Sequence, residues 1–204
     1  AKTTTATTLA MALAIHMNKR VLLVDCDQQR DASRLLLQPF YDNEGGDDNE
    51  GGPPLPTLTE LLTAEDGQRC RTLYDMAMRW HNDLTEESPR VHAGEAFKVL
   101  PSDFDDEFRC PGGGTLWVLG GHRHMHRWER MIAVNEHASE DDVDAASYTG
   151  AMYHGILATA TTADVNAEIV ILDLDPSAGA LNRSLVMSCH YFLTPARTSL
   201  WRIH

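Results

Sequence analysis

Two short apolar runs, each ending in acidic residues, constrain the fold of this chain more than any other feature. They are "VLLVDCD" at residues 21–27 and "IVILDLD" at residues 169–175. Continuous apolar runs of this length predict parallel strands that are buried on both faces of a sheet. Ligands bind at the carboxyl ends of such strands, which makes Asp25, Asp27 and Asp173 candidate site residues.

Helices and further strands alternate with these two runs. More strands are expected within "EAFKVLP", "TLWVLGG" and "HYFLTP", and helices are expected at about 2–17, 32–37, 57–67, 68–84, 126–135, 145–160 and 180–190. Asn18 is a plausible stop for the first helix. The alternation predicts the α/β class, with a mostly parallel sheet and helices on both of its faces.

The chain is expected to form one domain over residues 1–204, because 204 residues are enough for a single core. Residues 41–56 are acidic and rich in Gly and Pro, which predicts a mobile surface loop. Residues 57–114 form a variable region with few clear signals.

Charge and cysteine usage narrow the class of protein. The formal net charge is -13, which disfavours non-specific binding of this segment to DNA or to an anionic membrane. No apolar run approaches the ~18 residues of a membrane helix, and no signal peptide is visible. The four cysteines, at positions 26, 70, 110 and 189, form no CxxC pair. They suit reduced thiols, and we expect a cytoplasmic protein.

The opening "AKTTT" matches only the end of a phosphate-binding loop, G-x-x-x-x-G-K-[ST]. Lys2 would neutralise β- and γ-phosphate oxygens, and the Thr3 hydroxyl would bind Mg²⁺. Thr4 would lie in the first helical turn, near the α-phosphate, where free N–H groups favour anions. The chain is then expected to begin inside the loop, with the first strand and the glycines upstream of Ala1. Alone, the motif is weak evidence and is better explained as a Thr-rich helix start with a solvated lysine.

The acidic strand ends complete the pattern. Asp25 and Asp27, at the end of one buried strand, have the chemistry to hold the water shell of a metal and to polarise an attacking water. Asp173, after the second run, has the position of a Walker B acid that orients Mg²⁺ through water. Each could instead be a solvated strand-end acid. Three such signals in the right order are more specific than any one alone.

These segments resemble the deviant-Walker P-loop ATPases of the ParA/MinD superfamily, and most of all the ParA (Soj-like) partition ATPases. "AKTTTATTLAMALA…NKRVLLVDCDQQRDAS" is similar to the end of Walker A and the Walker A′ segment of that family. "LWVLGG" and "IVILDLDPSAGALNRSLVMSCHYFLTPAR" are similar to a middle strand and to Walker B with the strand after it. The resemblance covers about 1–37, 115–121 and 168–197, and implies a P-loop NTPase fold.

The resemblance also implies residue roles. Lys2 would be the main Walker A lysine and a catalytic residue, Thr3 a Mg²⁺ ligand and Thr4 a phosphate contact. Asp27 would position the hydrolytic water, Asp25 would lie in the outer sphere of Mg²⁺, and Asp173 would be the Walker B acid. Pro176 and Ser177 would belong to the switch region that senses the γ-phosphate. The second lysine of the family, which reaches across the dimer, would lie upstream of Ala1.

Three residues depart from the family pattern. Ala1 replaces a loop glycine, and its Cβ could crowd the phosphates. Gln28 stands where proline is usual in the A′ segment. Asp175 stands where the first switch proline is usual, and its carboxylate would repel a γ-phosphate. The C-terminal part, which in the family supplies adenine contacts and often basic DNA-binding residues, is expected to be absent.

The expected function is that of an ATPase with ATP and Mg²⁺ as cofactors. It would dimerise on ATP, act in chromosome or plasmid partition or in cargo positioning, and be stimulated by a centromere-binding, ParB-like partner. Non-specific DNA would bind through the missing C-terminal region, and no membrane partner is expected. The alternatives are a MinD-like ATPase that positions a membrane complex, and a non-hydrolysing regulatory or scaffold protein of the same fold.

A histidine cluster leaves one more alternative open. His122, His124 and His126 alternate, so in an extended segment they would share a face and could bind Zn²⁺. The competing interpretation is a loop-to-helix junction with solvated histidines. Arg123, Arg127 and Arg130 make this the most basic stretch, which could touch a nucleotide, DNA or a partner. The A′ segment around Cys26 is also similar to that of the nitrogenase iron protein, but neither Cys70 nor Cys110 lies in the small-residue loop that a cluster-binding cysteine of that family needs.

Overall fold

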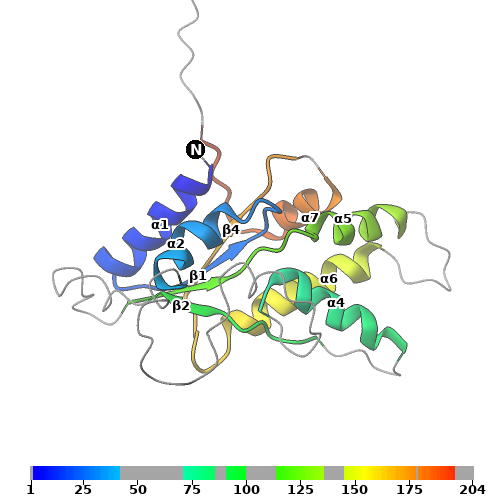
Figure 1. Ribbon diagram of the computed structural model, residues 1–204, viewed down its shortest axis with the longest axis horizontal. Helices are drawn as coiled ribbons and strands as arrows, with labels where there is room; N and C mark the ends of the chain where they lie inside the picture. The colour runs from blue at the N-terminus through cyan, green and yellow to red at the C-terminus, as the bar shows by residue number, and fades with distance from the viewer. Residues whose placement is uncertain are drawn as a thin grey trace, which may run out of the picture.

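The computed structural model describes residues 2–41, 71–85, 91–99, 114–135, 145–177 and 179–195. Within these residues the chain forms a four-stranded sheet of order β2-β3-β1-β4 (Figure 1). The strands are β1 (Arg20–Asp25), β2 (Phe97–Val99), β3 (Thr115–Leu119) and β4 (Ile169–Asp173). The central strand β1 pairs parallel with β3 and β4, and β2 pairs antiparallel with β3. The expected mostly parallel sheet is confirmed.

One face of the sheet is covered by α1 (Lys2–His16) and α2 (Asp31–Tyr41). Successive side chains of a strand point to opposite faces. Val21 and Leu23 of β1 are fully buried in the cluster on this face, together with Ala10 and Ala14 of α1. The small alanines allow α1 to approach the strands closely, which places the start of this helix at the carboxyl edge of the sheet.

The opposite face is covered by α4 (Leu73–Asn82), α5 (Met125–Val134), α6 (Ala145–Ala160) and α7 (Ala180–Ser188), and a short 3₁₀ turn (Asp83–Thr85) follows α4 (Figure 1). Leu22 and Val24, the other two apolar residues of β1, are buried on this face. Trp80, Trp128 and Tyr148 pack edge to face at its centre, with ring centroids 5.3 to 6.2 Å apart. Helices therefore cover both faces, as expected.

The boundaries of most elements agree with the sequence expectations. The first helix ends at His16, and Asn18 takes the left-handed conformation with a φ of 53° that ends a helix. The strand expected within "EAFKVLP" is present as β2. The expected loop at 41–56 lies outside the described residues from position 42 on, and the helix expected at 57–67 lies outside them entirely.

The strand expected within "HYFLTP" was wrong. Residues 189–195 form no helix or strand, and the side chains of Tyr191, Phe192 and Leu193 are 92%, 80% and 67% exposed. The apolar composition favours a strand, but a strand requires hydrogen bonds to a neighbouring strand, and this segment has none among the described residues. No helix in the described part of the chain is long and apolar enough to cross a membrane.

Candidate functional site

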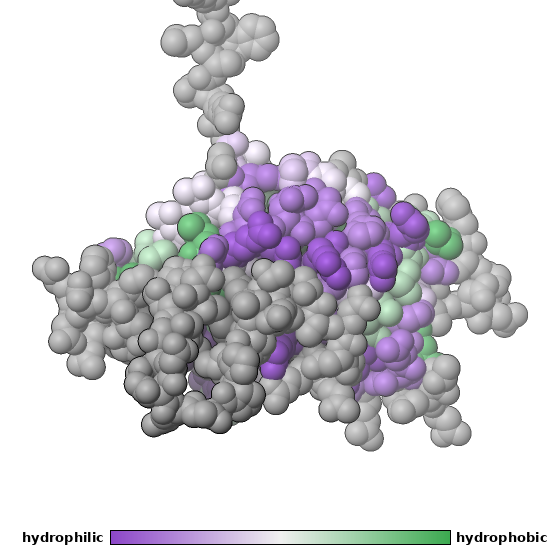
Figure 2. Space-filling model, viewed as in Figure 1, coloured by the Kyte–Doolittle hydropathy of each residue, from purple (hydrophilic) through white to green (hydrophobic). Residues whose placement is uncertain are grey.

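The carboxyl ends of β1 and β4 meet the start of α1 at one edge of the sheet, where hydrophilic side chains gather on the surface (Figure 2). Asp25 and Asp173 are directly paired in the parallel register. The backbone N–H of Cys26 donates to the Asp173 carbonyl oxygen over 2.9 Å. The side chain of Thr3, in the first turn of α1, hydrogen-bonds to the Asp173 carboxylate. Expected site residues from three separate segments are therefore close together.

The Asp25 carboxylate is fully buried and anchors the turn after β1. Its Oδ2 accepts from the backbone N–H of Ser33 at 2.8 Å and from the Ser33 hydroxyl at 2.7 Å, and its Oδ1 accepts from the Asp27 N–H at 3.1 Å. Burial raises the pKa of Asp25 from 3.8 to about 6, although these hydrogen bonds act in the opposite direction. Asp25 thus holds Asp27 and the start of α2 in place.

Ser33 and Gly121 belong to this edge but were not among the expected site residues. The Ser33 hydroxyl donates to Asp25 and accepts from the backbone N–H of Gly121 at 2.9 Å. A Cβ at Gly121 would lie 2.9 Å from the Asp25 Cγ and 3.0 Å from the Asp27 carbonyl oxygen, so only glycine fits there. The Gly pair that ends "TLWVLGG" and the Ser of the A′ segment are the sequence signals that could have indicated them.

The Asp173 carboxylate is a candidate ligand for a cation. Its side chain is 3% exposed, and its Oδ2 is buried with no hydrogen-bond partner among the described residues. Burial raises the pKa of Asp173, the Thr3 hydrogen bond lowers it, and the nearby Asp27 raises it. A buried carboxylate oxygen without a partner is costly unless water or a cation satisfies it. The donor set of carboxylate and hydroxyl oxygens therefore fits Mg²⁺ with its water shell.

Asp27 is 8% exposed and follows Asp25 by two residues. Its Oδ1 accepts from the Gln29 N–H at 2.8 Å, and its carbonyl oxygen accepts from the Arg30 N–H at 3.1 Å. Burial raises the pKa of Asp27, as does the carboxylate of Asp175, whereas Lys2 lowers it. A carboxylate held in this way can accept a hydrogen bond from water and orient that water.

Lys2 and Thr4 lie in the exposed first turn of α1. The Lys2 ammonium is close enough to Asp27 and Asp173 to lower the pKa of both carboxyl groups. The first turn of α1 holds no acidic residue, so its free N–H groups and helix dipole favour an anion. A phosphate group could thus approach with Lys2 on one side and the acidic cluster, screened by a cation, on the other.

The segment after β4 is shaped by Asn182 of α7, which sequence reasoning also missed. Its side-chain amide donates to the carbonyl oxygens of Asp175 and Ser177, each at 2.8 Å, and to the Ser177 hydroxyl at 3.2 Å. The Asp175 carboxylate in turn accepts from the Ser177 N–H at 2.7 Å. Pro176 is exposed between them. The expected switch residues therefore lie on a turn that is tied to α7 and begins two residues after Asp173.

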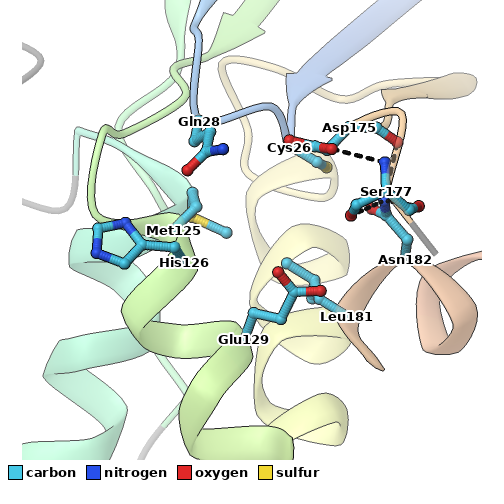
Figure 3. A pocket seen from close by; sticks show the side chains of 9 residues that line it. All are labelled: Cys26, Gln28, Met125, His126, Glu129, Asp175, Ser177, Leu181 and Asn182. Atoms are coloured by element: carbon cyan, nitrogen blue, oxygen red, sulfur yellow. Dashed lines mark hydrogen bonds between the residues drawn. The ribbon is translucent and has the colours of Figure 1, made fainter. Parts of the chain in front are cut away.

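A small pocket opens between this turn and α5, with a volume of about 80 Å³ (Figure 3). Its lining comprises Cys26, Gln28, Met125, His126, Glu129, Asp175, Ser177, Leu181 and Asn182. Burial raises the pKa of the Cys26 thiol well above its ordinary value, so this cysteine is an unreactive thiol at neutral pH. The pocket holds water-sized groups and is too small for a nucleotide.

The histidine cluster does not have the geometry of a metal site. His122 is fully buried and stacks on Tyr74 with 4.7 Å between ring centroids. His124 and His126 lie edge to face with their neighbours, at 5.0 Å and 6.1 Å. Among the described residues, no group of three His, Cys, Asp or Glu side chains is arranged to hold a metal ion. Of the four cysteines, Cys26 and Cys189 are free thiols and the other two lie outside the described residues.

Comparisons with known proteins agree with this geometry. The sequence model of the CobQ/CobB/MinD/ParA nucleotide binding domain matches residues 1–187. Protein DIP2308 from Corynebacterium diphtheriae has a similar structure, with a TM-score of 0.62 and 23% identity over 97% of this chain and 56% of its own. The structure of pNOB8 ParA is similar with a TM-score of 0.50 and 17% identity over 93% of this chain and 46% of its own.

At these identities the structural likeness establishes the fold alone. The chain spans about half the length of the solved structures that it matches. A search of curated protein sequences found no match.

Proposed function

The chain belongs to the CobQ/CobB/MinD/ParA nucleotide binding domain family, and on this premise we propose that it binds MgATP, hydrolyses it slowly and dimerises when ATP is bound. The observation that carries the proposal is the buried Asp173 carboxylate. One of its oxygens lacks a hydrogen-bond partner among the described residues, and its side chain is bonded to Thr3 at the start of α1. A divalent cation bound there would lie between an acidic strand end and an anion-binding helix start.

The proposal assigns a role to each site residue. Lys2 binds the β- and γ-phosphate oxygens, and Thr4 contacts the α-phosphate at the first turn of α1. Thr3 and Asp173 would hold Mg²⁺, and Asp25 would lie nearby as an outer-sphere carboxylate that also fixes Asp27 and Ser33. Mg²⁺ would supply charge neutralisation on the phosphates. Asp27 accepts a hydrogen bond from the attacking water and aligns it, while Pro176 lies on the turn that responds to the γ-phosphate.

We propose that the biological role is chromosome or plasmid partition, or the positioning of another cargo. A centromere-binding, ParB-like partner would stimulate hydrolysis, and non-specific DNA would bind outside residues 1–204. Membership of a family that includes both ParA and MinD supports this role and its MinD-like alternative equally at the level of the domain. Membrane recruitment of the complete protein would favour the MinD-like alternative.

The test is the steady-state rate of ATP hydrolysis by the full-length protein, with and without duplex DNA. Asp27→Ala and Lys2→Ala variants are measured in parallel, and Ser188→Ala, in the last turn of α7, is the matched control. We expect a slow rate that DNA raises, and a loss of at least about 100-fold in both variants, since aligned water and phosphate charge each contribute about that much. Unchanged turnover in Asp27→Ala would contradict the role of Asp27.

A second candidate, a regulatory protein that binds nucleotide without turnover, is favoured by one observation. The carboxylate of Asp175 is close enough to Asp27 to raise its pKa, and a second negative charge there would oppose a γ-phosphate. Under this alternative, ATP binds with Mg²⁺ but no phosphate is released. An Asp175→Pro variant that restores hydrolysis would identify Asp175 as the residue that suppresses turnover.

A further inference from the structure

Four arginines that are close in sequence to the candidate site have no role in the proposed ATPase reaction. Arg30 directly precedes α2 and Arg34 lies in its first turn, while Arg123 precedes α5 by two residues and Arg127 lies in its first turn. The guanidinium groups of Arg34 and Arg123 lower the pKa of Arg30, after burial, which is the larger cause. None of the four forms an ion pair within the described part of the chain. Such clustering is unusual in a chain with a net charge of -13.

Hydrogen bonds between the two elements hold the cluster together. The Gly121 N–H donates to the Ser33 hydroxyl at 2.9 Å, which fixes the end of β3 against the first turn of α2. The Ser33 N–H and hydroxyl are fixed in turn by Asp25. Arg30 precedes this turn and Arg123 follows Gly121 by two residues. Their proximity is thus a consequence of the sheet edge and not of flexible side chains alone.

Arg30 has two further features that a solvated arginine would not need. Its backbone has a φ of 59°, in the left-handed region, which costs a non-glycine residue roughly 1 kcal/mol. Its Nε is buried and has no hydrogen-bond partner among the described residues. A buried guanidinium N–H without an acceptor is costly, and an anion would satisfy it.

His122 adds a second buried donor beside the arginines. The imidazole is fully buried, and its Nδ1 accepts from the His124 N–H at 3.1 Å. The ring therefore carries its hydrogen on Nε2. That Nε2 is buried and has no hydrogen-bond partner among the described residues. Burial lowers the pKa of His122 to about 4, as do His124, Arg123, Arg30 and Arg127, so the ring remains a neutral donor at pH 7.

We propose that Arg30, Arg123, Arg127 and His122 form a binding site for the phosphate group of a small molecule, separate from the nucleotide site. Guanidinium groups bind phosphate oxygens through paired N–H donors, and the uncapped start of α5, with no acid in its first turn, adds positive potential. A second, phosphorylated ligand would therefore bind on the same face as ATP.

The observations favour a compact ligand over a nucleic acid. Binding to a DNA backbone relies on exposed lysines and arginines along an extended surface, and it is weakened by a strongly acidic protein. Here the two donors without partners are both buried and do not lie on an extended exposed surface. A terminal phosphate, with three oxygens on one small group, can accept from several N–H donors at once.

The test measures binding of inorganic phosphate to the full-length protein by ³¹P NMR titration at low ionic strength. All variants are made in the Lys2→Ala background, so that phosphate binding at the nucleotide site does not contribute. Arg30→Gly is the most informative variant because glycine accepts the left-handed φ and the fold is preserved. Arg123→Ala removes a second guanidinium. Arg130→Ala, further along α5, is the matched control.

We expect saturable phosphate binding that is weakened about tenfold or more in Arg30→Gly and in Arg123→Ala, as expected for loss of one charge-assisted hydrogen-bonding group. Arg130→Ala should bind as the background does. No saturable binding, or equal binding in all variants, would overturn the proposal. So would loss of duplex DNA binding in Arg30→Gly with phosphate binding unchanged, which would identify a nucleic-acid surface. ATP binding by the protein with an intact Lys2 is measured separately, so failure of one proposal leaves the other testable.

Discussion

At the scale of single residues, the site is held together by the Asp25 carboxylate, whose burial costs free energy. Asp25 accepts three hydrogen bonds and yet keeps a raised pKa, because burial outweighs the hydrogen bonds. These hydrogen bonds connect the end of β1 to the turn at Asp27 and to the start of α2. A single residue thus couples the stability of the fold to the position of the proposed water-aligning group.

The raised pKa of Asp25 predicts a specific dependence of stability on pH. The folded protein binds a proton at Asp25 between the unfolded value of 3.8 and the folded value of about 6. This contribution to stability is complete below the lower value and is lost as pH rises through the upper one. The loss amounts to roughly 3 kcal/mol, at about 1.4 kcal/mol for each pKa unit.

Urea unfolding of the wild type and of Asp25→Asn at a series of pH values measures this effect. The difference in unfolding free energy between the two proteins should change by about that amount between pH 4 and 7, in favour of the variant at the higher pH. A difference that stays constant across this range would show that the pKa of Asp25 is the same in the folded and the unfolded protein.

The second prediction for a single residue concerns the substitution Gly121→Ala. In Gly121→Ala the new methyl group would meet the Asp25 carboxyl at 2.9 Å and the Asp27 carbonyl oxygen at 3.0 Å, and the backbone oxygen cannot move freely. We expect a loss of about 1–3 kcal/mol in stability, as for overpacking of a core. Gly150→Ala is the control, because no atom lies within 4 Å of its new Cβ and α6 should gain up to ~1 kcal/mol. Equal melting temperatures in the two variants would contradict this interpretation.

At the scale of elements, α7 controls the turn that follows β4. Asn182 is 7% exposed and is the source of three hydrogen bonds to Asp175 and Ser177. Its amide replaces the backbone partners that a turn outside regular structure otherwise lacks. The position of the turn is consequently tied to that of α7.

We therefore predict that Asn182→Ala loosens this turn more than it weakens the domain. Loss of the buried amide should cost about 1–3 kcal/mol, because carbonyl oxygens of the turn lose their donor. Backbone amide hydrogen exchange at Ser177 should become faster, since its N–H bond to Asp175 depends on the same turn. Ser188→Ala, which removes only a bond within α7, is the control. Unaltered exchange at Ser177 would show that Asn182 does not hold the turn.

At the scale of the whole molecule, the part of this strongly acidic chain that the structure describes includes an exposed apolar patch. Met187, Tyr191, Phe192 and Leu193 lie at or beyond the end of α7 and are 67% to 92% exposed. A contiguous exposed apolar segment of this kind marks a surface that another part of a protein or a partner covers.

This patch predicts binding of an apolar dye by residues 1–204. A triple variant, Tyr191→Ser, Phe192→Ser and Leu193→Ser, should lower the fluorescence of bound 8-anilinonaphthalene-1-sulfonate and leave the melting temperature unchanged, because these side chains contribute little to the core. Val134→Ser, at an isolated residue that is 72% exposed, is the control and should have little effect on the dye. Equal fluorescence in the triple variant and the wild type would locate the dye elsewhere.

The sequence by itself determined the elements and the edge at which the acids lie. Apolar runs and helical periodicity are local properties, so β1, β3, β4 and the described helices could be predicted within a few residues. An acid that follows a parallel strand must lie at the carboxyl edge whatever the order of the strands, so Asp25, Asp27 and Asp173 could be placed there from the sequence.

Only the tertiary structure decided which groups touch. The pairing of Asp25 with Asp173, the bond from Gly121 to Ser33 and the arginine cluster all join segments that are far apart along the chain. The antiparallel direction of β2 and the absence of a strand at 189–195 likewise depend on which backbone lies alongside. Periodicity carries no information about such contacts, because they are selected by packing and hydrogen bonding across the whole core.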